Sequence, residues 1–133
     1  MIAADWANNL ATLSSLTADI VPPPTPATPT PSDGPRHTVS FLMSDGDNVQ
    51  WVLNDWGNPE PDNWYNSPDR GSVPLGWTLA PSLSALAPTV MNDIYSRASP
   101  NDEFVAGPSG AGYSFPNDFP TAAAATANAE ETR

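Results

Sequence analysis

Residues 37–56 read HTVSFLMSDGDNVQWVLNDW and hold the pattern of a strand, a turn and a helix in one run. HTVSFLM at 37–43 is rich in β-branched and aromatic residues, which predicts a strand. SDGDN at 44–48 is a cluster of turn-forming residues. The residues at 48–56 then predict a short helix, because their apolar side chains recur at helical spacing: Val49, Val52, Leu53 and Trp56.

The same order of elements returns downstream. LGWTLA at 75–80 predicts a second strand, and the apolar spacing over 82–97 predicts a helix that Pro88 either kinks or starts. EFVA at 103–106 predicts a short third strand, which the glycine-rich loop GPSGAGYSFP at 107–116 follows. Alternation of this kind predicts right-handed crossovers and a parallel sheet.

Three parallel strands do not make a closed structure. They leave two unpaired edges and incompletely covered faces, and such a sheet is normally part of a barrel or of a doubly wound sheet. We therefore expect an α/β fold, a partial (β/α) barrel-like domain with about three parallel βα units. Its structural partner would be the missing remainder of the parent domain.

Four segments are expected along the 133 residues. Residues 1–21 form an N-terminal helical segment, because apolar residues recur at helical spacing over 3–20. Residues 22–35 hold seven of the 17 prolines and form a Pro/Thr-rich linker, which separates this helix from everything else. Residues 36–120 form the α/β domain fragment, and 121–133 form an alanine-rich tail that is helical or frayed.

The charge balance excludes several kinds of partner. The net charge is −11 with no lysine and four arginines, so the chain lacks the clustered cations that nucleic acids and anionic membranes require. No apolar run is long enough for membrane insertion, and the N-terminus does not read as a signal peptide. With no cysteine and only one histidine, His37, the chain offers neither a disulfide nor a two-histidine site. Neutral sugars suit such an acidic chain, as does a metal ion.

Asp45 and Asp47 stand two residues apart directly after the first strand. Ligands of parallel α/β folds bind beyond the carboxyl ends of the strands, so this pair is a candidate for the acid, base or nucleophile of glycoside hydrolysis. The alternative is an Asp-Gly turn in which Asn48 caps the next helix. A helix–loop–helix calcium site is rejected, because Val49 and Trp56 stand where ligands are needed. A looser Ca²⁺ or Mg²⁺ site through the two aspartates stays open.

Aromatic residues are the second candidate set, because aromatic rings stack on the apolar faces of sugars. Trp64 and Tyr65 lie in a polar loop, which favours a binding role. Trp51 and Trp56 lie at helical spacing, which favours packing, and Trp77 in the middle of a strand fits either role.

The glycine-rich loop at 107–116 is the third candidate. Its glycines permit a close approach of backbone to ligand. It lacks the Lys and Ser/Thr of a P-loop, and its glycines do not have the GxGxxG spacing. We interpret it as a rigid turn that presents Tyr113 into a cleft.

GAGYSFP at 110–116 resembles the signature of the GxGYxYP putative glycoside hydrolase family. Three longer blocks, at 37–51, 70–88 and 101–116, are similar to successive blocks of the family's C-terminal domain in order and in approximate spacing. The resemblance covers about residues 36–120.

The resemblance implies hydrolysis of glycosidic bonds in a polysaccharide or oligosaccharide by a longer parent protein, which would be extracellular or periplasmic. It also implies a barrel-like C-terminal domain. The catalytic candidates are Asp45 and Asp47, and no cofactor or metal is assigned to them. The substrate-binding candidates are Asn48, Trp77, Ser109, Gly110, Gly112 and Tyr113. Phe115 replaces the second tyrosine of the family signature and removes one hydroxyl.

Two alternatives stand beside this interpretation. One is a non-catalytic carbohydrate-binding module that uses Trp64, Tyr65 and Tyr113, and the other is an inactive remnant. All three depend on geometry that sequence does not supply. For a shared site, the acidic turn beginning at Ser44 and the glycine-rich turn ending at Pro116 must open onto one hollow at one end of the sheet.

Overall fold

The computed structural model describes residues 4, 6–25, 34–56, 60 and 63–132. Within them the chain forms a mixed α/β fold with a three-stranded parallel sheet and five α-helices. The α-helices are α1 (Leu10–Leu13), α2 (Val49–Trp51), α3 (Leu83–Leu86), α4 (Pro88–Ser96) and α5 (Ala122–Glu131). A π-helical turn (Val52–Trp56) and two 3-10 turns (Trp64–Asn66 and Pro116–Asp118) accompany them. In this part of the chain no helix has the length and apolar character needed to cross a membrane.

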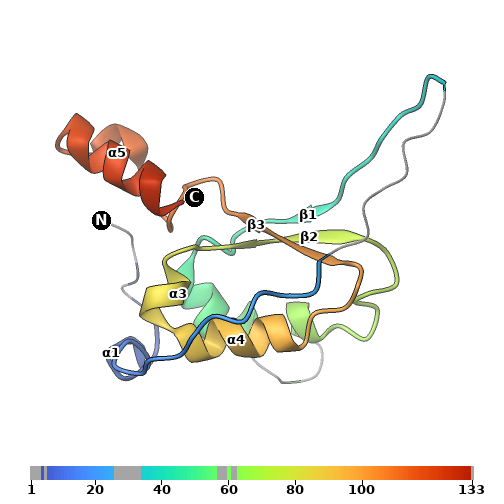
Figure 1. Ribbon diagram of the computed structural model, residues 1–133, viewed down its shortest axis with the longest axis horizontal. Coiled ribbons are helices and arrows are strands. Elements are labelled where there is room, and N and C mark those ends of the chain that lie inside the picture. The colour runs from blue at the N-terminus through green and yellow to red at the C-terminus, as the bar shows by residue number, and fades with distance from the viewer. Residues whose placement is uncertain (1–3, 5, 26–33, 57–59, 61–62, 133) are drawn as a thin grey trace.

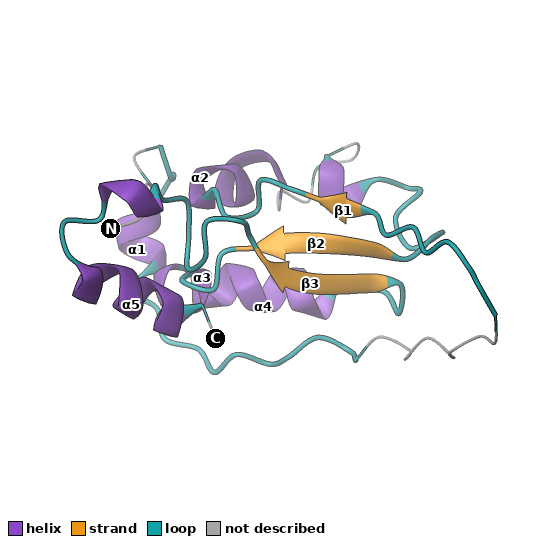
Figure 2. Ribbon diagram, turned by 90° about the horizontal axis from the view of Figure 1, so that it is seen from above, coloured by secondary structure: helices purple, strands orange, loops and turns teal. Residues whose placement is uncertain are grey.

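The sheet has the order β1 (Leu42–Met43), β2 (Leu75–Leu79), β3 (Asp102–Ala106), with both pairs parallel. The second and third strands therefore form within a residue of the predicted positions. Helices α3 and α4 cover one face of the sheet, and α5 lies beyond the carboxyl ends of the strands (Figures 1 and 2). The opposite face carries no helix of the described residues (Figure 1). The parallel sheet expected from the sequence is confirmed, whereas closure into a barrel is not seen in these three strands.

β1 is much shorter than the strand predicted at 37–43, since only Leu42 and Met43 pair with β2. Leu42 lies opposite Gly76, and β2 begins one residue earlier, at Leu75. The residues before Leu42 thus run past the end of the neighbouring strand. β-propensity is realised only beside a partner, and the contact with β2 ends at Phe41, whose carbonyl accepts a hydrogen bond from Gly76 N at 3.0 Å.

The helix predicted over 82–97 is divided at Pro88. α3 ends at Leu86, and α4 starts with Pro88 at its first position. Proline disfavours the helical conformation in the residue before it, and Ala87 has φ −154° and ψ 64°. Of the two predicted effects of Pro88, the start of a helix is confirmed.

The helix predicted over 3–20 is wrong in extent. Among the described residues of that segment only α1 is helical, and residues from Ser15 to Ile20 are not. Ser14 and Ser15 each donate a side-chain hydrogen bond to the carbonyl three residues earlier, at 3.3 and 2.7 Å. Such local bonds compete with helix propagation, and Leu16 of the predicted apolar stripe is exposed.

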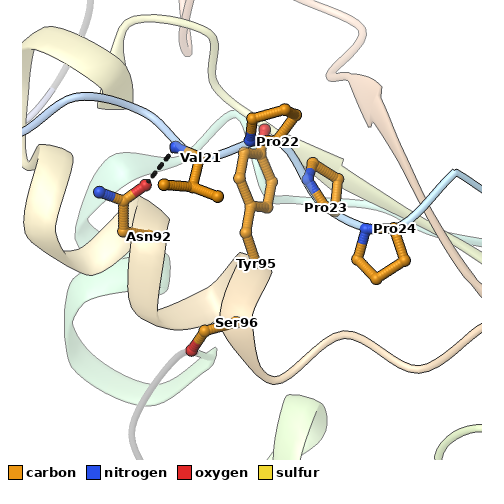
Figure 3. A pocket seen from close by; sticks show the side chains of 7 residues that line it. All are labelled: Val21, Pro22, Pro23, Pro24, Asn92, Tyr95 and Ser96. Atoms are coloured by element: carbon orange, nitrogen blue, oxygen red, sulfur yellow. Dashed lines mark hydrogen bonds between the residues drawn. The ribbon is translucent and has the colours of Figure 1, made fainter.

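Residues 19–24, the proline strap, lie along α4 instead of standing apart from the domain (Figure 3). The Asn92 side chain holds their backbone at two points. Its Oδ1 accepts a hydrogen bond from Val21 N at 2.9 Å, and its Nδ2 donates to the carbonyl of Asp19 at 2.8 Å. Pro22–Pro24 and the ring of Tyr95 border a cavity of about 370 Å³ beside this clamp.

The proline strap corrects the predicted role of the Pro/Thr-rich linker at 22–35. Its first residues do not separate the N-terminal segment from the domain, because they pack on α4. Residues 26–33 of the predicted linker lie outside the described residues. An extended proline segment suits this role, since it has little conformational freedom to lose on docking.

Three buried aromatic rings, of Trp56, Tyr65 and Trp77, form the centre of the core. The rings of Trp56 and Tyr65 are stacked with centroids 4.9 Å apart, and Trp77 meets them edge-on at 5.3 and 5.1 Å. Both arrangements are favoured by the aromatic quadrupole. Trp56 thus has the packing role that its helical spacing indicated.

Asp102, the first residue of β3, is buried and ties this core to the amino end of the sheet. Trp77 Nε1 donates to Oδ1 at 2.8 Å, Ser99 N donates to Oδ2 at 2.7 Å, and the Arg70 guanidinium donates to Oδ2 as well. Arg70 also lies over the Tyr65 ring, 4.2 Å from its centroid. Burial by itself raises the pKa of Asp102, but the hydrogen bonds from Ser99 and Trp77 and the charge of Arg70 outweigh it, so the pKa is lowered.

Asp102→Asn is expected to lower the free energy of unfolding by about 3 kcal/mol at neutral pH, because it leaves Arg70 uncompensated beside the core. Since the folded-state pKa lies below the unfolded one, this stabilisation is complete above the unfolded pKa and is lost as the pH falls through the folded pKa. Urea denaturation followed by tryptophan fluorescence should show the difference from wild type shrinking below about pH 4. Glu103→Gln, at the exposed neighbouring position, is the control. A deficit that stays constant down to pH 2 contradicts the assignment.

Asn92→Ala is expected to release the proline strap from α4. Two hydrogen bonds of about 1 kcal/mol each are lost, so Val21 N–H should exchange with solvent at least ten times faster. Hydrogen exchange measured by NMR checks this. Ser96→Ala is the control. Ser96 lines the same cavity, but its hydroxyl bonds only within its own helix, so this variant should leave the exchange rate of Val21 unchanged.

Candidate functional site

The acidic turn at 44–48 and the glycine-rich turn at 107–116 meet beyond the carboxyl ends of the strands. Tyr113 N donates a hydrogen bond to the main-chain carbonyl of Asp47 at 2.7 Å. A Cβ on Gly107 would lie 2.4 Å from the Cβ of Asp47, so the glycine permits this contact. The two turns therefore lie at the same end of the sheet, as the shared site requires. The common hollow between them stays a prediction.

The acidic turn is clamped onto the end of β2 through Gly46. Gly46 N donates to Thr78 Oγ1 at 2.9 Å, and its carbonyl accepts from Ala80 N at 2.9 Å. Thr78 Oγ1 donates in turn to the carbonyl of Met43 at 3.0 Å. Asp45 has a left-handed backbone with φ 71°, which turns the chain so that Gly46 can approach β2.

The two aspartates of the turn differ in environment. Asp47 is only 3 % exposed, whereas Asp45 is exposed. Of the residues that the structure describes, none donates a hydrogen bond to either carboxylate or forms an ion pair with it. Asp47 lies against Gly107, and its carboxylate oxygens are not among the fully buried polar atoms that lack a partner, so water can reach them.

Asn48 stands at the N-cap of α2, but its side chain makes no capping hydrogen bond there. Its Oδ1 is buried, and no donor reaches it from the described part of the chain. The Asp-Gly turn of the alternative interpretation is present, since Asn48 N donates to the carbonyl of Asp45 at 3.0 Å, but Asn48 does not cap α2 with its side chain. The Asn48 amide oxygen therefore has no donor, and it follows in sequence an Asp47 carboxylate to which no described residue donates.

Ser82 is a polar residue at this end of the sheet that the sequence interpretation missed. It is buried, its N–H donates to the carbonyl of Ala111 at 3.0 Å, and its Oγ finds no partner among the described residues. Ala111 is two residues before Tyr113, which bonds to Asp47, so this stretch of the glycine-rich turn joins the ends of β1 and β2. The available signal was the position of Ser82, two residues after the end of the second predicted strand.

The residues of the glycine-rich turn divide between two neighbours. Gly110, with φ 79°, faces α5, because a Cβ there would lie 2.8 Å from Thr132 Oγ1 and 2.9 Å from Asn128 Nδ2. The carbonyl of Ser109 accepts from Ser114 Oγ at 3.1 Å within the turn. Gly112 is buried next to Tyr113. Gly110 is therefore placed to receive α5, while Gly112 and Tyr113 lie where the turn reaches Asp47.

Two aromatic candidates are committed to the core. Trp77 is buried and its Nε1 bonds to Asp102, so it has no free face for the sugar that we assigned to it. Tyr65 is buried as well, and its hydroxyl donates to the carbonyl of Ile94 at 2.9 Å. Burial raises the pKa of Tyr65, against the effect of nearby Arg70, and keeps the phenol neutral. Trp77 and Tyr65 are therefore core residues and not part of the candidate site.

The exposed aromatic residues differ from the expected ones. Trp64 is exposed, as its polar loop indicated, but Trp51 is exposed too, although its helical spacing favoured packing. Tyr113 is half-buried, and its ring meets that of Phe115 edge-on at 5.3 Å. Over the described residues, no three His, Asp or Glu side chains gather into a group that could hold a metal ion.

These features first define a class, an α/β domain that collects polar side chains at the carboxyl ends of parallel strands, where such folds bind ligands. The family model of the GxGYxYP putative glycoside hydrolase C-terminal domain matches residues 35–133. The chain therefore belongs to this family. The match also takes in α5, beyond the stretch over which the sequence motifs resemble the family.

One solved structure is similar over nearly the whole chain. It is the crystal structure at 1.25 Å resolution of a putative hydrolase from Bacteroides thetaiotaomicron VPI-5482. The two are 37 % identical with a TM-score of 0.77, over 96 % of this chain and 24 % of that chain. The chain thus spans about a quarter of the length of that protein. The comparison with curated proteins finds no match.

Gly46→Ala is expected to detach the acidic turn from β2. A Cβ at this position would lie 1.4 Å from the carbonyl oxygen of Thr78, which is backbone and cannot move aside freely. We expect a loss of roughly 3 kcal/mol in the free energy of unfolding, at the upper end of overpacking effects. Thermal denaturation measures it. Ser44→Ala, an exposed change in the same turn, should lie within about 0.5 kcal/mol of wild type. Equal melting of the two variants would contradict the close approach of Gly46.

Proposed function

We propose that this chain supplies part of the active site of a glycoside hydrolase that acts on a polysaccharide or oligosaccharide, with Asp47 as a reacting carboxylate. The observation that carries the proposal is the state of Asp47, which is buried beyond the strand ends without a hydrogen-bond donor among the described residues. Membership of the family supports the class of reaction.

Glycoside hydrolysis uses two carboxyl groups, one that protonates the leaving oxygen and one that acts as nucleophile or base. Asp47 is the better candidate of the pair for a fixed role, because its main chain is held by Tyr113 and it faces Gly107. Asp45 is exposed two residues away, and it or a carboxylate from the remainder of the parent protein would complete the pair. Asn48 follows Asp47 directly in sequence, and its buried amide oxygen and the buried hydroxyl of Ser82 have no partner among the described residues.

The same proposal includes the setting of the domain. Two unpaired sheet edges and one sheet face without a described helix support a larger, barrel-like sheet in the parent protein, to which the missing strands belong. The fourfold greater length of the similar solved protein agrees with this. An extracellular or periplasmic location follows from a polymeric sugar substrate. The alternative of a carbohydrate-binding module is weakened, because Tyr65, one of its three binding residues, is buried in the core.

Asp47→Asn is expected to lower the turnover number for a neutral polysaccharide at least 100-fold, because the amide can neither give a proton nor attack. Affinity for the sugar should persist. Release of reducing ends measures turnover, and affinity electrophoresis measures binding. Asp69→Asn is the matched control, since Asp69 is an exposed aspartate in the loop before β2, at the other end of the sheet.

Asp45→Asn separates the two carboxylates. If Asp45 is the second catalytic group, this variant should lose turnover to a similar degree, and if the partner lies elsewhere it should retain most of it. Full turnover in Asp47→Asn contradicts the proposal. Sugar binding without turnover in the wild-type parent protein, which would hold both carboxylates, favours the non-catalytic alternative.

A further inference from the structure

The exposed tryptophans of this chain gather around α2 and the π-helical turn that follows it. Trp6, Trp51 and Trp64 are 78 %, 40 % and 38 % exposed, whereas Trp56 in the same region is fully buried. The rings of Trp51 and Trp64 are stacked, with centroids 5.8 Å apart and planes 16° from parallel. Trp6 joins them through its backbone, because its carbonyl accepts from the Asn54 side chain at 3.1 Å.

This arrangement leaves a large apolar area in water. Burying an aromatic side chain is worth about 2 kcal/mol or more, and the chain realises this with Trp56 and Tyr65. Tyr65 follows Trp64 directly in sequence, yet one ring is inside the core and the other lies outside it. Stacking against each other holds the two rings in a fixed geometry, and the parts that stay exposed offer an apolar aromatic surface suited to a ligand with a flat apolar face.

We propose that Trp51 and Trp64 form a sugar-binding platform, which holds a neutral oligosaccharide that extends from the acidic turn. The ligand class rests on the proposed function. Indole faces stack on the C–H faces of pyranose rings.

The charges near the platform disfavour other ligands. Arg70 and Arg97, which lie against the ring of Tyr65, already pair with Asp102 and Asp93. With a net charge of −11 and no lysine, the chain offers little to a phosphate, a nucleic acid or an anionic membrane. Two half-exposed rings are also far smaller than the roughly 800 Å² per side of a stable protein interface.

The platform lies close to the acidic turn along the chain. α2 begins at Val49, directly after Asn48, and Trp51 is its third residue. One helical turn is about 5 Å along the axis, so the backbone of Trp51 lies within about a turn of the acidic site. An oligosaccharide longer than two or three units can therefore reach both.

The test uses the full 133-residue chain and two neutral probes, cellohexaose and maltohexaose. Isothermal titration calorimetry and quenching of tryptophan fluorescence measure binding. Wild type should bind at least one probe, Trp64→Ala should bind it at least tenfold more weakly, and Trp51→Ala combined with Trp64→Ala should abolish binding. Trp64→Phe keeps a ring face and should restore most of the affinity. Phe41→Ala, which removes an exposed aromatic ring beside β1, should bind as wild type does.

Thermal melting establishes that each variant is folded, and Trp64→Phe covers the case in which the alanine variants are not. Wild-type affinity in the double variant overturns the platform, as does a wild type that binds neither hexasaccharide. Failure of the platform is distinguishable from failure of the proposed function. Asp47→Asn should keep hexasaccharide binding while losing turnover, and the double tryptophan variant should keep turnover of a short aryl glycoside.

Discussion

The rest of the structure depends on the hydrogen bonds and the ion pair of the buried Asp102 carboxylate. This carboxylate joins the indole of Trp77 in β2, the backbone at the start of β3, and Arg70 in the loop that precedes β2. Arg70 in turn covers the ring of Tyr65, so the aromatic core is closed at the amino end of the sheet by one ionic group. A misplaced β2 or β3 would leave that charge unpaired in the interior, which makes their relative position costly to change.

The two buried aspartates, Asp102 at the start of β3 and Asp47 in the turn after β1, differ in their hydrogen bonding. Asp102 at the amino end accepts from a backbone amide, an indole and a guanidinium. Asp47 at the carboxyl end is equally buried, but no described residue donates to its carboxylate. The bonds of Asp102 hold the structure together, whereas the Asp47 carboxylate has no donor among the described residues, and we propose it as a reacting group. Backbone contacts through Gly46 and Tyr113 keep Asp47 in place without using its carboxylate.

The sheet is covered unevenly by the described residues. β2 is buried along nearly its whole length, while β1 and β3 are edges and Phe41 and Leu42 are exposed. Parallel strands are normally covered on both faces, because their crossovers place helices there. α3 and α4 cover one face only (Figure 1). The similar solved protein is about four times as long, which agrees with the larger sheet that we propose for the parent protein.

Local sequence determined the order of strands, turns and helices, an irregularity of the helix at Pro88 and the family. These depend on backbone preferences over a few residues and on motifs read in order. Only the tertiary structure decided the length of β1, the docking of the proline strap, and which aromatic residues are free. Trp77 is excluded from the site by Asp102, which lies 25 residues away in sequence, and adjacent Trp64 and Tyr65 differ in exposure. Burial depends on partners from distant parts of the chain, and no local pattern contains them.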